Sequence, residues 1–182
     1  NKTIVNVPDL KNTLLQGSKV INNICFYNNT AFIGCGQGII QFDLTQDVIQ
    51  NTFYIGTGGT AVNIRDIAIY KDSLFAATDN GIYKASLNDP NLNNYTDWIH
   101  IGAPIPNGVY NTIATVGDSL YTNLSLRLTN GAYDKDTMYV YSNGKWVHFK
   151  YYQGNVYITS LESCQVNNKD YLVVSSQYSI SV

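Results

Sequence analysis

The chain has 182 residues, of which 45% are hydrophobic, 13% aromatic and only 13% charged, with a formal net charge of −2. This amount of apolar sequence can bury a sizeable core, and the low, slightly acidic charge argues against a nucleic-acid binder that needs a basic stripe. No apolar run approaches the roughly 20 residues of a membrane helix, and no signal peptide is visible.

A repeat of strand-like segments dominates the sequence. Residues 21–44 and 64–87 align at an offset of 43, and a third copy begins at Ile113, 46 residues after Ile67. Self-similarity with a period of roughly 40 to 50 residues, carried by short strands, is typical of β-propeller blades. We therefore predict an all-β fold: a β-propeller segment of about four blades, each a four-stranded antiparallel sheet, forming an open arc of a larger ring.

In chain order, we expect one partial propeller domain over 1–182, in which 1–20 is the end of a preceding blade plus a connection. In each repeat an alternating strand leads through a polar turn to a small apolar strand, and a glycine turn leads to a third strand. Gly38 and Gly81 share one repeat position, which predicts a positive φ there. The four blade repeats are expected near residues 21–56, 64–102, 110–150 and 156–182. The outer strands of the first two blades are expected at 52–55 and 98–101.

Both ends of the sequence lie within strand-like segments, so we interpret the chain as a piece of a longer protein. Signals for export or anchoring would then lie outside these residues. An open arc has two unpaired edges, and such edges predict self-association between copies of the chain.

Three cysteines show no metal-ligand spacing and leave one odd residue. Cys25 and Cys35 lie on the two arms of one predicted hairpin, at positions equivalent to Ala68 and Thr78 of the next blade. We expect three free, buried thiols, including Cys164. A disulfide between Cys25 and Cys35 is the alternative.

His100 and His148 are the only histidines, and both end a Trp-x-His pattern on the outer strand of a blade. Two histidines without a cysteine or carboxylate pattern nearby are a weak metal signal, because a zinc site needs three or four ligands. The glycine-rich segments 34–38 and 56–59 precede no helix and lack the Gly-Lys-Ser/Thr ending of a phosphate loop. We interpret them as strand-connecting turns.

Aspartates occur mostly in predicted turns, where this residue is locally favoured. We expect solvated turn positions rather than a calcium loop or the paired carboxylates of a glycosidase or lyase. Segments 72–74, 118–120 and 136–138 match a short Asp-Ser/Thr-aliphatic pattern that resembles O-glycosylation sites of the Bacteroidetes, and turn chemistry is the alternative explanation. The aspartates considered are Asp66, Asp72, Asp79, Asp118, Asp134 and Asp136.

Aromatic residues gather on the outer strands, where they could stack against sugars but more often pack between blades. Adjacent strand residues point to opposite faces, so at least one residue of the pair Tyr151–Tyr152 should reach solvent or a neighbour. The other aromatic residues considered are Trp98, Trp146 and Tyr157.

Part of the sequence resembles a known family. The resemblance rests on the segments 21–27 (INNICFY), 36–44 (GQGIIQFDL), 67–85 and 88–98 (NDPNLNNYTDW). These residues are similar to the N-terminal propeller of PorZ-like proteins, components of the type IX secretion system of Bacteroidetes. The resemblance implies a parent protein with two seven-bladed propellers and a C-terminal β-sandwich, located at the cell surface. It supplies no motif residue that can be carried over to this chain.

The resemblance implies a non-enzymatic propeller segment of a type IX secretion component, at the outer-membrane cell surface or in the periplasm of a Gram-negative bacterium. It would act as a scaffold and binding module for the sortase complex and for anionic lipopolysaccharide. Two alternatives stay open: a glycan-sensing periplasmic propeller of a hybrid two-component regulator, and a propeller-based polysaccharide lyase or glycosidase.

We assign no catalytic, cofactor-binding or metal-ligating residue and no cofactor, and the ligand-binding residues stay unassigned. The expected partners are other blades of the same parent chain, sortase-complex proteins and anionic lipopolysaccharide. Neither nucleic acid nor a membrane span is expected in this segment.

Overall fold

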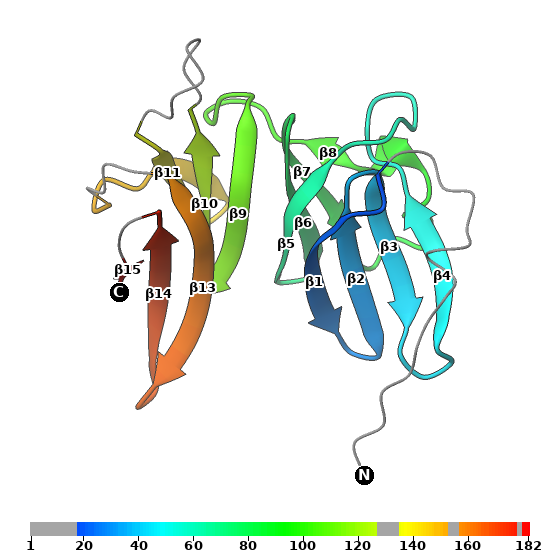
Figure 1. Ribbon diagram of the computed structural model, residues 1–182, viewed down its shortest axis with the longest axis horizontal. Coiled ribbons are helices and arrows are strands. Elements are labelled where there is room, and N and C mark those ends of the chain that lie inside the picture. The colour runs from blue at the N-terminus through cyan, green and yellow to red at the C-terminus, as the bar shows by residue number, and fades with distance from the viewer. Residues whose placement is uncertain (1–17, 127–134, 153–156, 178–179) are drawn as a thin grey trace.

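The computed structural model describes residues 18–126, 135–152, 157–177 and 180–182. Within them the chain forms four antiparallel sheets in sequence order, three with four strands and one with three. This arrangement confirms the predicted all-β propeller segment of about four blades. Figure 1 shows the first two sheets in one half of the view and the last two in the other. The one helix among the described residues is the short 3₁₀ turn η1 (Tyr95–Asp97).

Each sheet is a meander, because strands that pair with each other also follow each other in the sequence. Such neighbours can be joined by short hairpin turns. Blade 1 contains β1 (Ile21–Tyr27), β2 (Thr30–Cys35), β3 (Gly38–Asp43) and β4 (Val48–Phe53). Blade 2 contains β5 (Ile64–Tyr70), β6 (Ser73–Thr78), β7 (Gly81–Ser86) and β8 (Ile99–His100). Blade 3 contains β9 (Val109–Val116), β10 (Ser119–Ser125), β11 (Thr137–Ser142) and β12 (Lys145–His148). Blade 4 contains β13 (Ile158–Val166), β14 (Lys169–Ser176) and β15 (Ile180–Ser181).

Tight turns join the first two strands of every blade. The first turn residues Asn28, Lys71, Gly117 and Asn167 have φ between 51° and 53°. This left-handed conformation matches the twist of two-residue hairpins and explains the asparagine and glycine found there. The positive φ predicted for the glycine turn between the second and third strands is confirmed, with 106° at Gly81.

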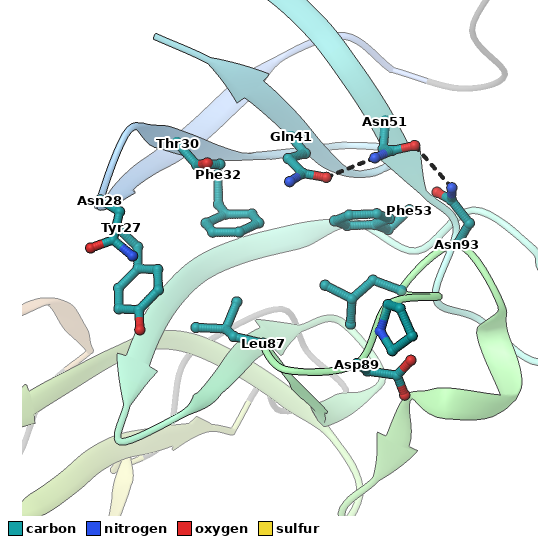
Figure 2. Close-up of a pocket in the computed structure, with 12 residues that line it drawn as sticks. Tyr27, Asn28, Thr30, Phe32, Gln41, Asn51, Phe53, Leu87, Asp89 and Asn93 are labelled. Atoms are coloured by element: carbon teal, nitrogen blue, oxygen red, sulfur yellow. Dashed lines mark hydrogen bonds between the residues drawn. The ribbon is translucent and has the colours of Figure 1, made fainter. Parts of the chain in front are cut away.

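The core consists of layers between consecutive blades. Between blades 1 and 2, Phe32, Phe53, Ile64 and Trp98 are buried together, and the ring centroids of Phe53 and Trp98 lie 6.0 Å apart. Figure 2 shows Phe32 and Phe53 on one side of this interface and Leu87 on the other. Burial of each large apolar side chain contributes roughly 1.5–3 kcal/mol, so neighbouring blades stabilise each other. Similar clusters lie between blades 2 and 3 and between blades 3 and 4.

The inner strands β1, β5, β9 and β13 contact one another in this order around the centre of the arc. β5 is buried on both faces, because it packs between the preceding and the following blade. On β1, in contrast, Ile24 and Phe26 are 46% and 65% exposed, whereas the equivalent Ile67 of blade 2 is 4% exposed. The described residues therefore form an open arc, and its first blade presents an apolar inner strand to solvent.

The outer strand of blade 1 lies earlier in the sequence than we predicted. We expected residues 52–55, but β4 begins at Val48 and ends at Phe53. The reason is a tight turn after β3, in which Asp43 Oδ1 accepts hydrogen bonds from the backbone N–H groups of Thr45 (2.7 Å) and Gln46 (3.0 Å). This side-chain turn reverses the chain at once. The preceding blade expected within 1–20 lies almost wholly outside the described residues.

Candidate functional site

A polar cavity opens at the end of the arc where the inner strands begin, here called the upper end. In Figure 1, β1 and β13 run downward from this end. Four of the lining residues occupy equivalent positions near the starts of β1, β5, β9 and β13, so the repeat brings one polar side chain from each blade to a single opening. The cavity of about 360 Å³, here called the axial pocket, is lined by Asn22, Asn63, Arg65, Asn111, Tyr157 and Thr159.

A hydrogen-bond network fixes most of these side chains. Arg65 donates through Nε to Asp79 and through Nη1 to Asn111 Oδ1 at 3.1 Å, which links blades 2 and 3. Asn63 Nδ2 donates to the other oxygen of Asp79 at 3.0 Å. Asn22 Nδ2 donates to Asn63 Oδ1 at 3.1 Å and connects blade 1. Three blades thus meet in one chain of amides around a single ion pair.

The chemistry of the axial pocket suits a hydroxyl-rich or anionic ligand. The Arg65 and Asp79 side chains are 33% and 40% exposed, so their ion pair adds only about 0–1 kcal/mol to stability. A guanidinium has five N–H donors, and the bonds to Asp79 and Asn111 leave others that can face a ligand. The amide, hydroxyl and guanidinium groups of the lining together offer both donors and acceptors, as sugar hydroxyls require, and the guanidinium also suits a phosphate or carboxylate.

Below the axial pocket, Asp66 fastens blade 2 to blade 3. Its Oδ2 accepts hydrogen bonds from Thr112 Oγ1 at 2.6 Å and from the Ile113 N–H at 2.8 Å, and its Oδ1 accepts one from the Ile67 N–H at 2.8 Å. Burial raises the pKa of Asp66 to about 6, and these hydrogen bonds partly offset that effect. Thr112 in turn links blade 3 to blade 4, because its Oγ1 accepts a hydrogen bond from the Leu161 N–H at 3.1 Å. These groups hold the inner strands together.

The expectation of solvated aspartates is wrong at two positions. Asp66 is 9% exposed on β5, and Asp136 is 2% exposed just before β11. Asp136 Oδ2 accepts from Asn123 Nδ2 at 2.8 Å and from the Ile158 N–H at 2.7 Å, which ties blade 3 to blade 4. Burial raises the pKa of Asp136 as well. The other aspartates lie in turns or outside the described residues: Asp72, Asp79 and Asp118 in turns, Asp134 outside.

The two histidines occupy equivalent positions on β8 and β12, as the repeat predicts. His100 packs on Tyr83 with centroids 4.7 Å apart, and His148 packs on Tyr139 at 6.1 Å. His100 Nε2 lies 2.7 Å from the carbonyl oxygen of Asn80, so this nitrogen carries the proton. No cluster of three or more metal-binding side chains occurs in the part of the chain that the structure describes.

The cysteines are free, as expected, but they are not all buried. Cys35 is buried, Cys25 is half-buried and Cys164 is exposed, so the burial prediction is wrong for the last. Cys25 pairs with Phe32 across the hairpin, and Cys35 pairs with Ile21, so the two thiols occupy different positions along the sheet. This register explains why the alternative disulfide does not form.

The aromatic residues and glycine turns behave largely as predicted. Trp98 and Trp146 are each 5% exposed and pack between blades. Tyr151 is 88% exposed and Tyr152 is half-buried against the blade 3–4 cluster, so one member of the pair reaches solvent. Tyr157 lines the axial pocket. The segments 34–38 and 56–59 are turns and connections between strands. Glycosylation of the Asp-Ser/Thr segments stays a prediction.

Our reading of the sequence missed the polar residues of the axial pocket. Asn22, Arg65, Asn111 and Thr159 are equivalent at offsets of 43, 46 and 48, but we aligned the repeats by their identical apolar residues. The available signal was a position that is polar in every blade and yet differs in residue type.

Among the described residues, none of the structure's helices is long and apolar enough to cross a bilayer. The sheets, their order and the axial pocket define a β-propeller segment with a polar upper opening. A family model described as the N-terminal β-propeller domain of PorZ (type IX secretion) matches residues 1–99. This match covers more than half of the chain, so the chain belongs to the PorZ N-terminal β-propeller family.

Solved structures support the fold. PorZ of Porphyromonas gingivalis, described as an essential bacterial surface component of the type IX secretion system, superposes with a TM-score of 0.58 at 16% identity over 92% of this chain. The extracellular domain of BT4673, a putative hybrid two-component system of B. thetaiotaomicron, gives a TM-score of 0.63 at 18% identity over 92%. The computationally designed Ika8 protein gives 0.55 at 13% identity over 90% of this chain and 45% of its own.

This chain spans 25% of the PorZ chain and 20% of the BT4673 chain. At these identities the similarity concerns the fold alone. The comparison with curated proteins gave no match.

Proposed function

We propose that this chain is a non-enzymatic, glycan-binding propeller segment of a type IX secretion component that works outside the cytoplasm, at the cell surface. Membership of the PorZ propeller family supports the secretion role. The observation that supports binding is the axial pocket, where four blades each contribute one equivalent polar residue, Arg65 among them. The ligand we propose is the polysaccharide of anionic lipopolysaccharide, and the outer faces of the blades would serve as a scaffold for sortase-complex proteins.

The geometry of the axial pocket supports a binding role rather than a catalytic one. Both oxygens of Asp79 accept hydrogen bonds, one from Arg65 and one from Asn63, so this carboxylate is already committed as a positioning group. The buried carboxylate of Asp66 is similarly engaged by three donors from the protein itself. A general acid or base must instead reach the substrate directly.

The test is calorimetric titration of the full-length protein that contains these residues with anionic lipopolysaccharide. Saturable binding is expected, and Arg65→Gln should weaken it roughly 10- to 100-fold, since a hydrogen bond to a charged group contributes about 1.5–3 kcal/mol. The matched control is Lys145→Gln, which removes an exposed positive charge from blade 3 and should leave the Kd unchanged.

Two results would contradict the proposal. Absence of saturable binding to anionic lipopolysaccharide would remove the glycan-binding role. Equal weakening by Arg65→Gln and Lys145→Gln would show that the attraction depends on net charge alone and that the axial pocket is not the binding position.

A further inference from the structure

A second hollow lies beside blade 2 and is lined mainly by aromatic side chains. Its lining comes from the connection between blades 1 and 2, from β7, from η1 and from β8. The volume of about 340 Å³ falls at the lower end of the range for small-molecule sites, roughly 300–1,000 Å³. This aromatic groove is lined by Ile55, Thr57, Tyr83, Tyr95, Thr96, Trp98 and His100.

The aromatic groove combines buried rings with rings that are open to solvent. His100 is exposed and lies on Tyr83 with an interplanar angle of 36°. Trp98 is 5% exposed, whereas Tyr95 is 40% exposed. Exposed ring faces gathered in a hollow mark a surface that gains free energy when a ligand with an apolar face covers it.

The loop that carries Tyr95 is held in place before any ligand binds. Asn93 Nδ2 donates to Asn51 Oδ1 of β4 at 2.9 Å, as Figure 2 shows. The Trp98 indole N–H donates to the Leu92 carbonyl at 2.9 Å, and the Thr96 N–H donates to Asn94 Oδ1 at 3.2 Å. A ligand would therefore not have to order the loop, and this removes a common cost of binding.

One turn contacts both the aromatic groove and the axial pocket. The β6–β7 turn supplies Asp79, which holds Arg65 in the axial pocket, and Asn80, whose carbonyl accepts the His100 Nε2–H at 2.7 Å. Gly81 follows in the same turn, and a Cβ there would lie 2.5 Å from His100 Nε2. The same turn thus fixes one residue of each hollow, Arg65 and His100.

Blade 3 has residues equivalent to three rings of this groove, but it has no counterpart of the exposed Tyr95. Trp146, His148 and Tyr139 occupy the positions of Trp98, His100 and Tyr83, with the Tyr139 and His148 rings 6.1 Å apart at 59°. β11 and β12 are joined by the two-residue turn 143–144, so no blade-3 residue corresponds to Tyr95. The long connection 87–98 therefore builds a feature that packing of a blade does not require.

We propose that the aromatic groove is a saccharide-binding site that takes one neutral pyranose ring of a polysaccharide. The apolar C–H face of the sugar lies on Tyr95 and His100, and its hydroxyls hydrogen-bond with Thr57 and Thr96. Because Nε2 of His100 donates to Asn80, Nδ1 is the acceptor of the neutral ring. This inference rests on the proposed function in one respect, namely that the ligand is a glycan, but it concerns a different site and a different part of the ligand.

The test uses the full-length protein and two kinds of probe: neutral hexasaccharides of glucose, mannose, galactose and N-acetylglucosamine, and anionic lipopolysaccharide. Calorimetry gives the Kd of each probe. At least one neutral hexasaccharide is expected to bind, and Tyr95→Ala should raise its Kd roughly tenfold while Tyr95→Phe preserves it. Tyr151→Ala, which removes an 88% exposed tyrosine from the connection after β12, is the matched control and should have no effect.

The two proposals fail in different ways. If no neutral hexasaccharide binds, or if Tyr95→Ala and Tyr151→Ala bind as the unaltered protein does, the aromatic groove is not a sugar site, whatever lipopolysaccharide does. If a neutral hexasaccharide binds in a Tyr95-dependent manner while lipopolysaccharide does not bind, the aromatic groove is a sugar site and the proposed binding of lipopolysaccharide is wrong. An unchanged unfolding midpoint of Tyr95→Ala excludes misfolding as the cause of lost binding.

Discussion

Replacement of the buried Asp66 by asparagine should change how the stability of the chain depends on pH. The carboxylate lies between blades 2 and 3, with hydrogen bonds from Thr112, Ile113 and Ile67. Desolvation raises its pKa to about 6 from an ordinary value of 3.8, and the nearby Glu162 carboxylate acts in the same direction. Asp66→Asn keeps the shape of the side chain but cannot ionise.

The sign of the effect follows from the raised pKa. Below about pH 3.8 Asp66 is protonated in both the folded and the unfolded chain, so the full stabilising contribution of the bound proton is present. As the pH rises to about 6 and beyond, the folded chain must hold a buried charge and that contribution is lost. The difference between about 6 and 3.8 corresponds to about 3 kcal/mol of unfolding free energy.

Urea unfolding followed by tryptophan fluorescence, between about pH 4 and about pH 7.5, measures this quantity. The difference in unfolding free energy between the unaltered chain and Asp66→Asn should favour the unaltered chain by about 2.4 kcal/mol more at the acidic end, since the full contribution is reached only below the unfolded pKa. Asp72→Asn, which removes a carboxylate from an exposed turn, is the control. Parallel pH profiles of the unaltered chain and Asp66→Asn would refute the assignment of a buried, ionisable inter-blade contact.

Two further predictions concern the β6–β7 turn and the open inner strand. Gly81→Ala should lower the free energy of unfolding by about 2–4 kcal/mol, because φ is 106° and the new Cβ would lie 2.5 Å from His100 Nε2. Gly144→Ala, at φ 78° with nothing within 4 Å, should cost only about 1 kcal/mol, and equal losses in urea unfolding would contradict the steric explanation. Replacement of Ile24 and Phe26 by serine should reduce self-association in light scattering without lowering the unfolding midpoint, since both side chains are exposed on β1. An unchanged particle mass would show that this strand is not the surface through which copies associate.

The repeat predicted the blades because each of its apolar positions occupies the same place in the sheet of every blade. β1 and β5 begin at residues 21 and 64, where the first two repeats were expected to start, and Ile24 and Ile67 occupy the same position before the first hairpin turn of each blade. The position of β4 could not be predicted in this way. It depends on two hydrogen bonds, from the N–H groups of Thr45 and Gln46 to Asp43. At the equivalent place of the second blade, Ser86 Oγ accepts a single bond, from the Asn88 N–H at 3.3 Å, and β8 begins only at Ile99.

Asp66 shows why turn preference and strand alternation could not predict which aspartates are buried. A bulge follows Ile64, and from there alternation places Asp66 on one face of β5 with Ala68 and Tyr70. A half-buried strand would turn the face that carries such a polar residue to solvent. An inner strand of a propeller packs between two neighbouring blades, so both of its faces are covered and the period of two no longer separates buried from exposed positions. Burial of this carboxylate is acceptable because blade 3 supplies two donors from 46 and 47 residues away, the Thr112 hydroxyl and the Ile113 N–H, beside the local Ile67 N–H.

The same inter-blade contacts give the axial pocket its rigidity and couple ligand binding to the integrity of the arc. Asn22, Arg65 and Asn111 stand on three separate strands, and the Asp66 and Thr112 contacts directly below them fix the spacing of those strands. A ligand that bridges the axial pocket would bind the assembled arc and not the unfolded chain. At a free concentration of 100 times its Kd it should therefore stabilise the fold by about 2.7 kcal/mol. Separation of the blades would release the ligand, so a weakened Asp66 contact should lower affinity even though Asp66 does not line the axial pocket.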